Sequence, residues 1–203
     1  KEPKDILRSK VTGILRSVPF RQILQTRGME IEHLTESKQT ETTQRWKMGL
    51  MTPDGNIPLP TKIEFSRRGS ELGAIFEAID PEIVNEYAIQ PLMVNHYSAA
   101  AAFIQKIGAL TSRSTTQARD IFDLYLLLAG GLKPGALPLA HSIDVKDAQA
   151  KAMSIGYEVF KSHVVAFLKP EDQAQYDSSA VWDGIVLNVV EALGNMRKSH
   201  ETH

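Results

Sequence analysis

The sequence predicts an α+β fold, in which a small mixed or antiparallel sheet with a flanking helix is followed by a bundle of about four helices. Two observations support this prediction. Apolar and polar residues alternate with a period of two in several segments before residue 69, as in half-buried strands. From Tyr97 onward the apolar spacing is helical. We therefore expect two domains, a partial sheet domain over residues 1–95 and a helical domain over residues 96–203.

Composition and charge are those of an ordinary globular protein. Of the 203 residues, 42% are hydrophobic and 23% are charged, and the formal net charge is −1. This balance argues against a nucleic-acid coat protein or a membrane-surface protein. The chain has no cysteine, which excludes disulfides, thiolate catalysis and cysteine-based zinc sites. No apolar run approaches the ~20 residues that span a bilayer, and no signal-peptide pattern is found. We expect a cytoplasmic protein without a membrane partner.

The first 68 residues predict one amphipathic helix and three strands. The helix covers residues 3–16, with Pro3 in its first turn and Pro19 beyond its end. The strands cover residues 26–34, 41–51 and 60–68. The Thr52-Pro53-Asp54-Gly55 stretch between the last two strands has the residues of a tight turn.

Alternation along each predicted strand assigns side chains to opposite faces. In the first strand Met29, Ile31 and His33 are expected to share a face, and in the third Ile63 and Phe65 are expected to face inward. The residues expected to share a face in the second strand are Thr42, Gln44, Trp46, Met48 and Leu50.

The middle of the chain is expected to be irregular, because glycines and prolines interrupt residues 69–95, with a short strand at residues 88–94. Helices are then predicted at residues 98–112, 116–129, 145–168 and 178–197. Ser114 and Gln117 have the spacing of a capping box for the second of these helices. Gly130 and Gly131 end it.

One acidic motif in the middle region does not meet the structural requirement of the chemistry it resembles. Gly69-Ser70, followed by Asp80-Pro81-Glu82, formally matches the Gly-Ser lead and paired carboxylates of nucleotidyltransferases. That chemistry needs both carboxylates on one face of a strand, but Pro81 is disfavoured in a central strand. We therefore interpret Asp80-Pro81 as a turn.

Charges of both signs lie inside the apolar helical pattern of residues 103–128. Lys106 and Arg113 are two helical turns apart and share a face. Arg119, Asp120 and Asp123 lie in the first turns of the next helix. Charges in an apolar segment must either pair with one another or line a polar site. Since buried ion networks are commoner than catalytic ones, these residues taken alone favour structural pairing.

Three ordered motifs resemble those of a known family. They are Lys62-Ile63-Glu64, then Gln105-Lys106-x-x-Ala109-Leu110-x-x-Arg113, then Arg119-Asp120-x-x-Asp123-Leu124. Their order and spacing resemble the AbiEii/AbiGii toxin family, which comprises nucleotidyltransferase-like proteins of bacterial toxin–antitoxin systems. The resemblance covers residues 61–128.

The resemblance implies an enzyme that transfers a nucleotide from a nucleoside triphosphate (NTP) to RNA, with tRNA as one acceptor, and that has a cognate antitoxin. It implies Mg²⁺ and an NTP as cofactors, bound between a nucleotidyltransferase-like sheet domain and the helical domain. By resemblance, Glu64, Lys106 and Asp120 would be catalytic, and Glu64 would also contact the metal. The implied nucleotide-binding residues are Lys62, Arg113, Arg119 and Asp123.

The sequence departs from the family pattern at the leading motif, a Gly-Ser pair followed by two alternate carboxylates. Glu30-Ile31-Glu32 has the acidic spacing but no Gly-Ser lead. We expect the chain to be a fragment whose catalytic segment precedes Lys1, rather than a relative that lost metal catalysis. In either case this chain alone should bind Mg²⁺ poorly. The alternative function is an inactive module that binds nucleotide, RNA or an antitoxin.

Overall fold

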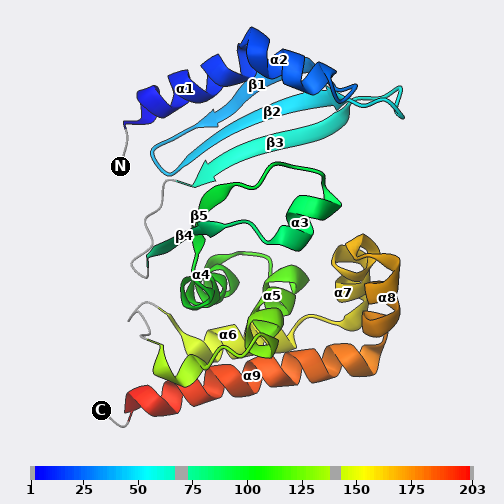
Figure 1. Cartoon of the computed structure of the whole chain (residues 1–203). Coiled ribbons are helices and arrows are strands. Elements are labelled where there is room, and N and C mark those ends of the chain that lie inside the picture. Colours follow the sequence, from blue (N-terminus) through cyan, green and yellow to red (C-terminus); the bar gives the residue numbers. More distant parts are fainter. Residues whose placement is uncertain (1–2, 67–72, 138–142, 202–203) are drawn as a thin grey trace. The chain divides into compact units, whose positions relative to one another are not determined.

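The computed structural model describes residues 3–66, 73–137 and 143–201 (Figure 1). In the last helix the description of side chains ends at Met196. Contacts within the chain define two compact units, Lys1–Gly69 and Ser70–His203. Residues 74–97 therefore belong to the second unit. The division into domains near residue 95 stays a prediction.

The first unit has two helices that lie along one face of a three-stranded sheet (Figure 1). The strands are antiparallel in the order β1-β2-β3, which confirms the predicted α+β class and antiparallel sheet. The turn between β2 and β3 is closed by a 3.2 Å hydrogen bond from the Gly55 amide to the Thr52 carbonyl. The elements are α1 (Lys4–Arg16), α2 (Val18–Gln25), β1 (Glu30–Gln39), β2 (Thr43–Met51) and β3 (Leu59–Ser66).

The helix α2 was not predicted, and its signal is a local one. Ser17 is its N-cap and accepts a 3.3 Å hydrogen bond from the Phe20 amide. Pro19 lies beyond the end of α1, as predicted, and it also lies in the first turn of α2. Proline is favoured in a first turn because the amides there have no intrahelical partner.

The core of the first unit forms on the predicted face of β2. Trp46 and Met48 are buried together with Leu15 of α1. In β1 a bulge between Ile31 and His33 shifts the alternation. Ile31 and Leu34 therefore pack against this core, while the side chain of His33 is 60% exposed. The prediction that His33 shares a face with Ile31 was wrong.

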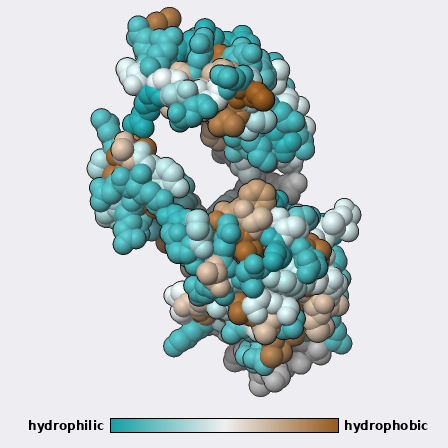
Figure 2. Space-filling view, turned by 90° about the vertical axis from the view of Figure 1, so that its right-hand side faces the viewer, coloured by the Kyte–Doolittle hydropathy of each residue, from teal (hydrophilic) through white to brown (hydrophobic). Residues whose placement is uncertain are grey.

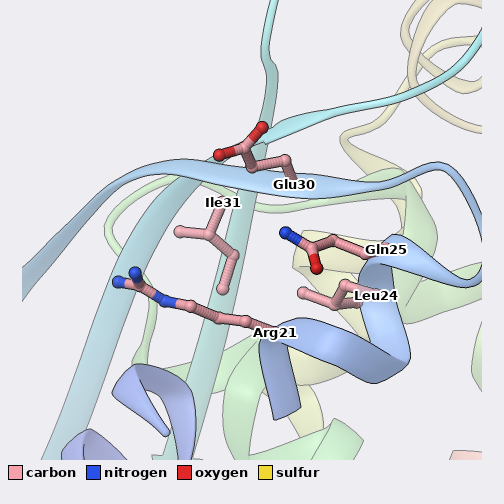
Figure 3. Close-up of a pocket in the computed structure, with 5 residues that line it drawn as sticks. All are labelled: Arg21, Leu24, Gln25, Glu30 and Ile31. Atoms are coloured by element: carbon pink, nitrogen blue, oxygen red, sulfur yellow. The ribbon is translucent and has the colours of Figure 1, made fainter. Parts of the chain in front are cut away.

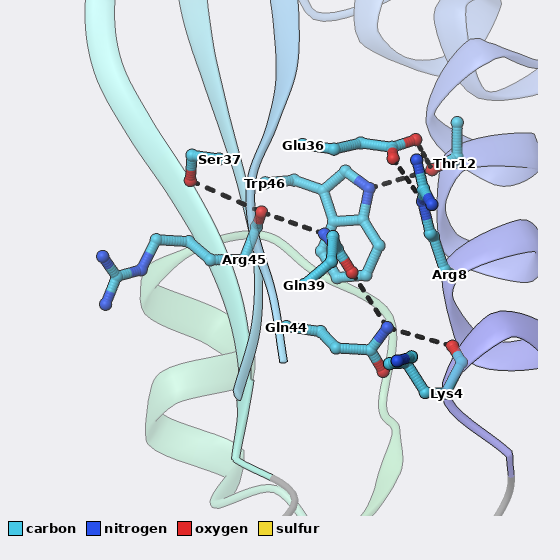
Figure 4. Close-up of polar contacts among 9 residues, drawn as sticks. All are labelled: Lys4, Arg8, Thr12, Glu36, Ser37, Gln39, Gln44, Arg45 and Trp46. Atoms are coloured by element: carbon cyan, nitrogen blue, oxygen red, sulfur yellow. Dashed lines mark hydrogen bonds and ion pairs between the residues drawn. The ribbon is translucent and has the colours of Figure 1, made fainter. Parts of the chain in front are cut away.

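Polar contacts fix α1 on the sheet (Figure 4). The Trp46 indole donates a 2.9 Å hydrogen bond to the Thr12 hydroxyl. That hydroxyl donates a 2.7 Å bond to Glu36 of β1, and Arg8 donates a 2.5 Å bond to the other carboxylate oxygen. The chain of bonds satisfies the buried indole and connects α1 to both β1 and β2.

Glu36→Gln is expected to destabilise the first unit at neutral pH and to have little effect in acid. The Thr12 hydrogen bond, and secondarily Arg8, hold the pKa of Glu36 below its usual 4.5. The stabilisation is complete above the unfolded-state pKa and disappears as the pH falls through the lower folded-state pKa. Native-state hydrogen exchange of the β2 amides should show that their free energy of opening falls by about 1–2 kcal/mol at neutral pH.

The matched control is Glu30→Gln, which changes an exposed glutamate of the same strand and should have no such effect. If Glu36→Gln remains less stable than wild type at pH values below the folded-state pKa of Glu36, the charge of the carboxylate is not what stabilises this contact.

The second unit pairs a two-stranded antiparallel sheet with a helical bundle. The long helix α9 packs against α5, α6 and α7 and runs along one side of the bundle (Figure 1). The elements are β4 (Ala74–Ala78), α3 (Pro81–Glu86), β5 (Met93–Tyr97), α4 (Ala99–Ser112), α5 (Ala118–Ala129), η1 (Pro134–Ala136), α6 (Val145–Met153), α7 (Tyr157–His163), η2 (Val165–Phe167), α8 (Pro170–Tyr176) and α9 (Ser179–Glu201).

Two sequence predictions for this unit need correction. The region expected to be irregular contains β4 and α3, and Asp80 is the N-cap of α3, accepting a 2.8 Å bond from the Glu82 amide. Gly69-Ser70 lies outside the described residues. The single helix expected at residues 145–168 is divided by Ser154 and Gly156 into α6 and α7, followed by η2. Asp80 in a cap position confirms that the Asp80-Pro81-Glu82 segment is not a strand.

The core of the second unit is built around two aromatic rings. Trp182 of α9 stacks on Phe160 of α7, with 4.2 Å between ring centroids and an interplanar angle of 14°. The Trp182 indole donates a 2.8 Å hydrogen bond to the Ile155 carbonyl. Both side chains are almost fully buried.

On the face drawn in Figure 2, hydrophobic side chains form separate small patches among hydrophilic ones. Across the described residues, no helix combines the length and the apolar character needed to cross a bilayer.

Candidate functional site

Asp120 lies at the centre of an ion cluster in the second unit. Its side chain is fully buried. Lys106 of α4 places its Nζ 3.1 Å from Asp120 Oδ1, and Arg113 binds Oδ2 through Nη1. Lys106 also pairs with Asp123. We call Lys106, Arg113, Asp120 and Asp123 the Asp120 cluster.

The local sequence explains why these groups meet. Ser98 caps the start of α4 by accepting a 3.1 Å bond from the Ala101 amide. Arg113 is the C-cap of α4, where the backbone becomes extended and leads to α5. Asp120 lies in the first turn of α5, where the helix dipole favours an anion. The N-cap of α5 is Gln117 and makes no side-chain cap hydrogen bond, so the predicted Ser114–Gln117 capping box was wrong.

Exposure differs sharply within the Asp120 cluster. The Asp120 side chain is 0% exposed, whereas those of Lys106 and Arg113 are 27% and 36% exposed. Two cations and two carboxylates make the cluster formally neutral. The buried carboxylate therefore holds two cations whose outer surfaces reach solvent, an arrangement that can present both to an anionic ligand.

Arg119 is not part of this cluster. It is exposed and lines a separate hollow with Gln117, Ala118, His163 and Phe167. Sequence analysis missed His163 and Phe167. Phe167 lies in an apolar stretch, residues 164–168, that contains no recognisable motif, and its side chain is 81% exposed. We call this cavity the Phe167 hollow.

Glu64 and Lys62 lie on β3 in the first unit. Arg45, the cross-strand partner of Glu64, donates a 2.5 Å bond to its carboxylate and thereby holds the pKa of Glu64 below its usual range. Lys62 is exposed and opposite Lys47. Within the described residues, no three histidine, aspartate or glutamate side chains gather so that they could hold a metal ion.

A small cavity of about 70 Å³ lies between α2 and β1 in the first unit. Arg21, Leu24 and Gln25 of α2 line it together with Glu30 and Ile31 of β1. Figure 3 shows the Ile31 side chain pointing toward α2 and the Glu30 carboxylate pointing away from it. Ligand pockets typically measure roughly 300–1,000 Å³, so this cavity is too small for a nucleotide. Glu30 of the Glu30-Ile31-Glu32 segment thus contributes to a minor cavity.

A protein family and several solved structures are similar to this chain. Residues 10–182 match the family described as nucleotidyl transferase AbiEii toxin of type IV toxin–antitoxin systems. A crystal structure of a candidate nucleotidyltransferase from H. pylori is 12% identical, with a TM-score of 0.47 over 86% of this chain and 70% of that chain. JHP933 from Helicobacter pylori is 14% identical, with a TM-score of 0.44 over 86% of this chain and 67% of that chain. No curated protein matches the sequence.

Proposed function

Because this chain belongs to the AbiEii nucleotidyl transferase toxin family, we propose that it acts in the transfer of a nucleotide from an NTP to RNA, with tRNA as the first acceptor to test. The observation that best supports this proposal is the Asp120 cluster. Its members occupy the positions of the family-like motifs and include two partly exposed cations held by one buried carboxylate. Membership of a toxin–antitoxin family also supports an antitoxin partner.

Within this proposal, Lys106 and Arg113 bind the triphosphate. Ammonium is a compact charge and guanidinium a planar fork, so together they suit the several oxygens of a polyphosphate. When the RNA hydroxyl attacks the α-phosphorus and pyrophosphate departs, these cations offset the charge that develops on the departing group. Asp120 positions both cations. Asp123, 40% exposed, competes with the phosphates for Lys106.

The described residues do not form a magnesium site of their own. Two metal ions commonly assist phosphoryl transfer of this kind by neutralising charge on the phosphates. Glu64 is engaged by Arg45, and the described residues contain no group of three metal-binding side chains. A single carboxylate is a poor Mg²⁺ ligand set without substrate phosphates. We therefore expect this chain alone to bind Mg²⁺ weakly.

Lys106→Ala is expected to reduce RNA labelling by about 10²-fold or more, the loss typical of removing one group that stabilises transition-state charge. Labelling is measured on the full-length protein with an α-³²P-labelled NTP, Mg²⁺ and tRNA, after circular dichroism shows that the variant is folded. Lys133→Ala removes an exposed lysine of the same unit and is the matched control, with unchanged labelling. Full activity in folded Lys106→Ala would contradict the assigned role.

A second candidate function is binding without catalysis, to nucleotide, RNA or an antitoxin. The engagement of Glu64 by Arg45 favours it, because this carboxylate is the one that the resemblance places at the metal. Calorimetry distinguishes the two functions: binding of NTP that Lys106→Ala weakens, without any RNA labelling by wild type, would support the binding module.

A further inference from the structure

The Phe167 hollow combines an exposed aromatic ring with two basic side chains. Its lining residues are Gln117, Ala118, Arg119, His163 and Phe167, and its volume is about 240 Å³. Pockets for drug-sized ligands measure roughly 300–1,000 Å³. The hollow lies slightly below this range, so it suits a ligand no larger than about one nucleotide, and none of its lining residues is acidic.

The ring of Phe167 is exposed although its backbone is firmly held. At 81%, its exposed fraction is the highest of any large hydrophobic side chain in the described parts of the chain. The preceding residues Val164 and Val165 are buried in the core, 6% and 3% exposed. Backbone hydrogen bonds from Phe167 to Val164 and from Leu168 to Val165, 2.9 and 3.0 Å long, close the turn. Burial of the two valines thus directs the ring outward from a fixed turn.

The two basic groups beside the ring are available to a ligand. Arg119 lies in the first turn of α5 and His163 ends α7, and both are exposed. In the part of the chain that the structure describes, neither side chain has an ion-pair or hydrogen-bond partner. Arg119 thus differs from Arg113, whose guanidinium is held by Asp120.

We propose that the Phe167 hollow binds one nucleotide, whose base stacks on Phe167 and whose phosphate lies between Arg119 and His163. Aromatic rings bind bases through their faces without sequence preference, and arginine is suited to phosphate. An acidic peptide would use the cations and leave the ring unused. The inference rests on the proposed function for its biological role, as a subsite for the acceptor RNA or for the free NTP.

Binding of a fluorescently labelled single-stranded oligoadenylate, followed by anisotropy without NTP or Mg²⁺, tests the proposal. Phe167→Ala should weaken binding roughly ten- to a hundredfold, and Phe167→Trp should restore it. Phe76→Ala removes a phenylalanine of the same unit that is 61% exposed and should leave affinity unchanged. Arg119→Gln should reduce the slope of log affinity against log salt by about 0.7, the value for one phosphate contact with a single strand.

A parallel calorimetric titration with ATP distinguishes the source of the nucleotide. Weakening by Phe167→Ala in the RNA series alone identifies the acceptor strand, and weakening in the ATP series identifies the free nucleotide. Wild-type affinity of Phe167→Ala for both probes, or failure of wild type to bind either, would overturn the inference. RNA binding that depends on Phe167 in a protein that labels no RNA would refute the proposed function and leave this inference standing.

Discussion

Replacing both Lys106 and Arg113 by alanine is expected to lower the free energy of unfolding of the second unit by about 3–5 kcal/mol, the usual cost of leaving a buried charge without its partners. Asp120 is fully buried, and these two cations are its ion-pair partners among the described residues. Each single variant should cost less, because the remaining cation still pairs with the carboxylate. Urea unfolding followed by far-ultraviolet circular dichroism measures these changes.

Adding Asp120→Asn to that double variant separates stability from chemistry. The neutral amide no longer needs a counter-charge, so the triple variant should recover at least half of the lost stability. RNA labelling should stay lost, because the phosphate-binding cations are still absent. A double variant as stable as wild type would show that Asp120 does not depend on these partners in the folded protein.

Trp182→Ala is expected to destabilise the second unit by about 3–5 kcal/mol, the range for removing a large aromatic side chain from a core. The change removes the ring stacked on Phe160 and leaves the Ile155 carbonyl without its indole donor. Trp182→Phe should cost less, since it loses the hydrogen bond and retains much of the packing. The measurement is again urea unfolding.

Leu187→Ala is the control for Trp182→Ala, because it truncates a side chain of the same helix that is 58% exposed. It should change stability by no more than about 0.5 kcal/mol, as expected of surface substitutions. An equal loss in both variants would mean that burial of the Trp182 ring in the core does not determine the effect.

Local patterns in the sequence predicted much of the fold. Alternation located the buried face of β2, and helical spacing located α4 and α5, because these elements bury one continuous apolar face. The bulge in β1 was missed since one extra residue reverses the alternation without a distinctive residue type. The break between α6 and α7 was missed because its signals, Ser154 and Gly156, interrupt an otherwise helical apolar pattern.

The candidate site was predictable only where its residues are close in sequence. Lys106, Arg113 and Asp120 lie on consecutive helices, so their pairing follows from spacing and the short connection between them. The Phe167 hollow joins the start of α5 to residues that follow α7, and no local pattern relates such distant segments. The exposure of Phe167 depends on which of several adjacent apolar residues the η2 turn directs inward, and tertiary packing decides this.

Each unit contains one tryptophan, whose fluorescence reports the unfolding of that unit. The chain contains two tryptophans, and both are buried: Trp46 in the core of the first unit and Trp182 in that of the second. Indole emission shifts to longer wavelength when a buried ring meets water. Trp46→Phe and Trp182→Phe proteins therefore each report the melting of one unit in the intact chain. Coincident emission transitions would reveal cooperative folding of the two units, and separate transitions would reveal autonomous ones.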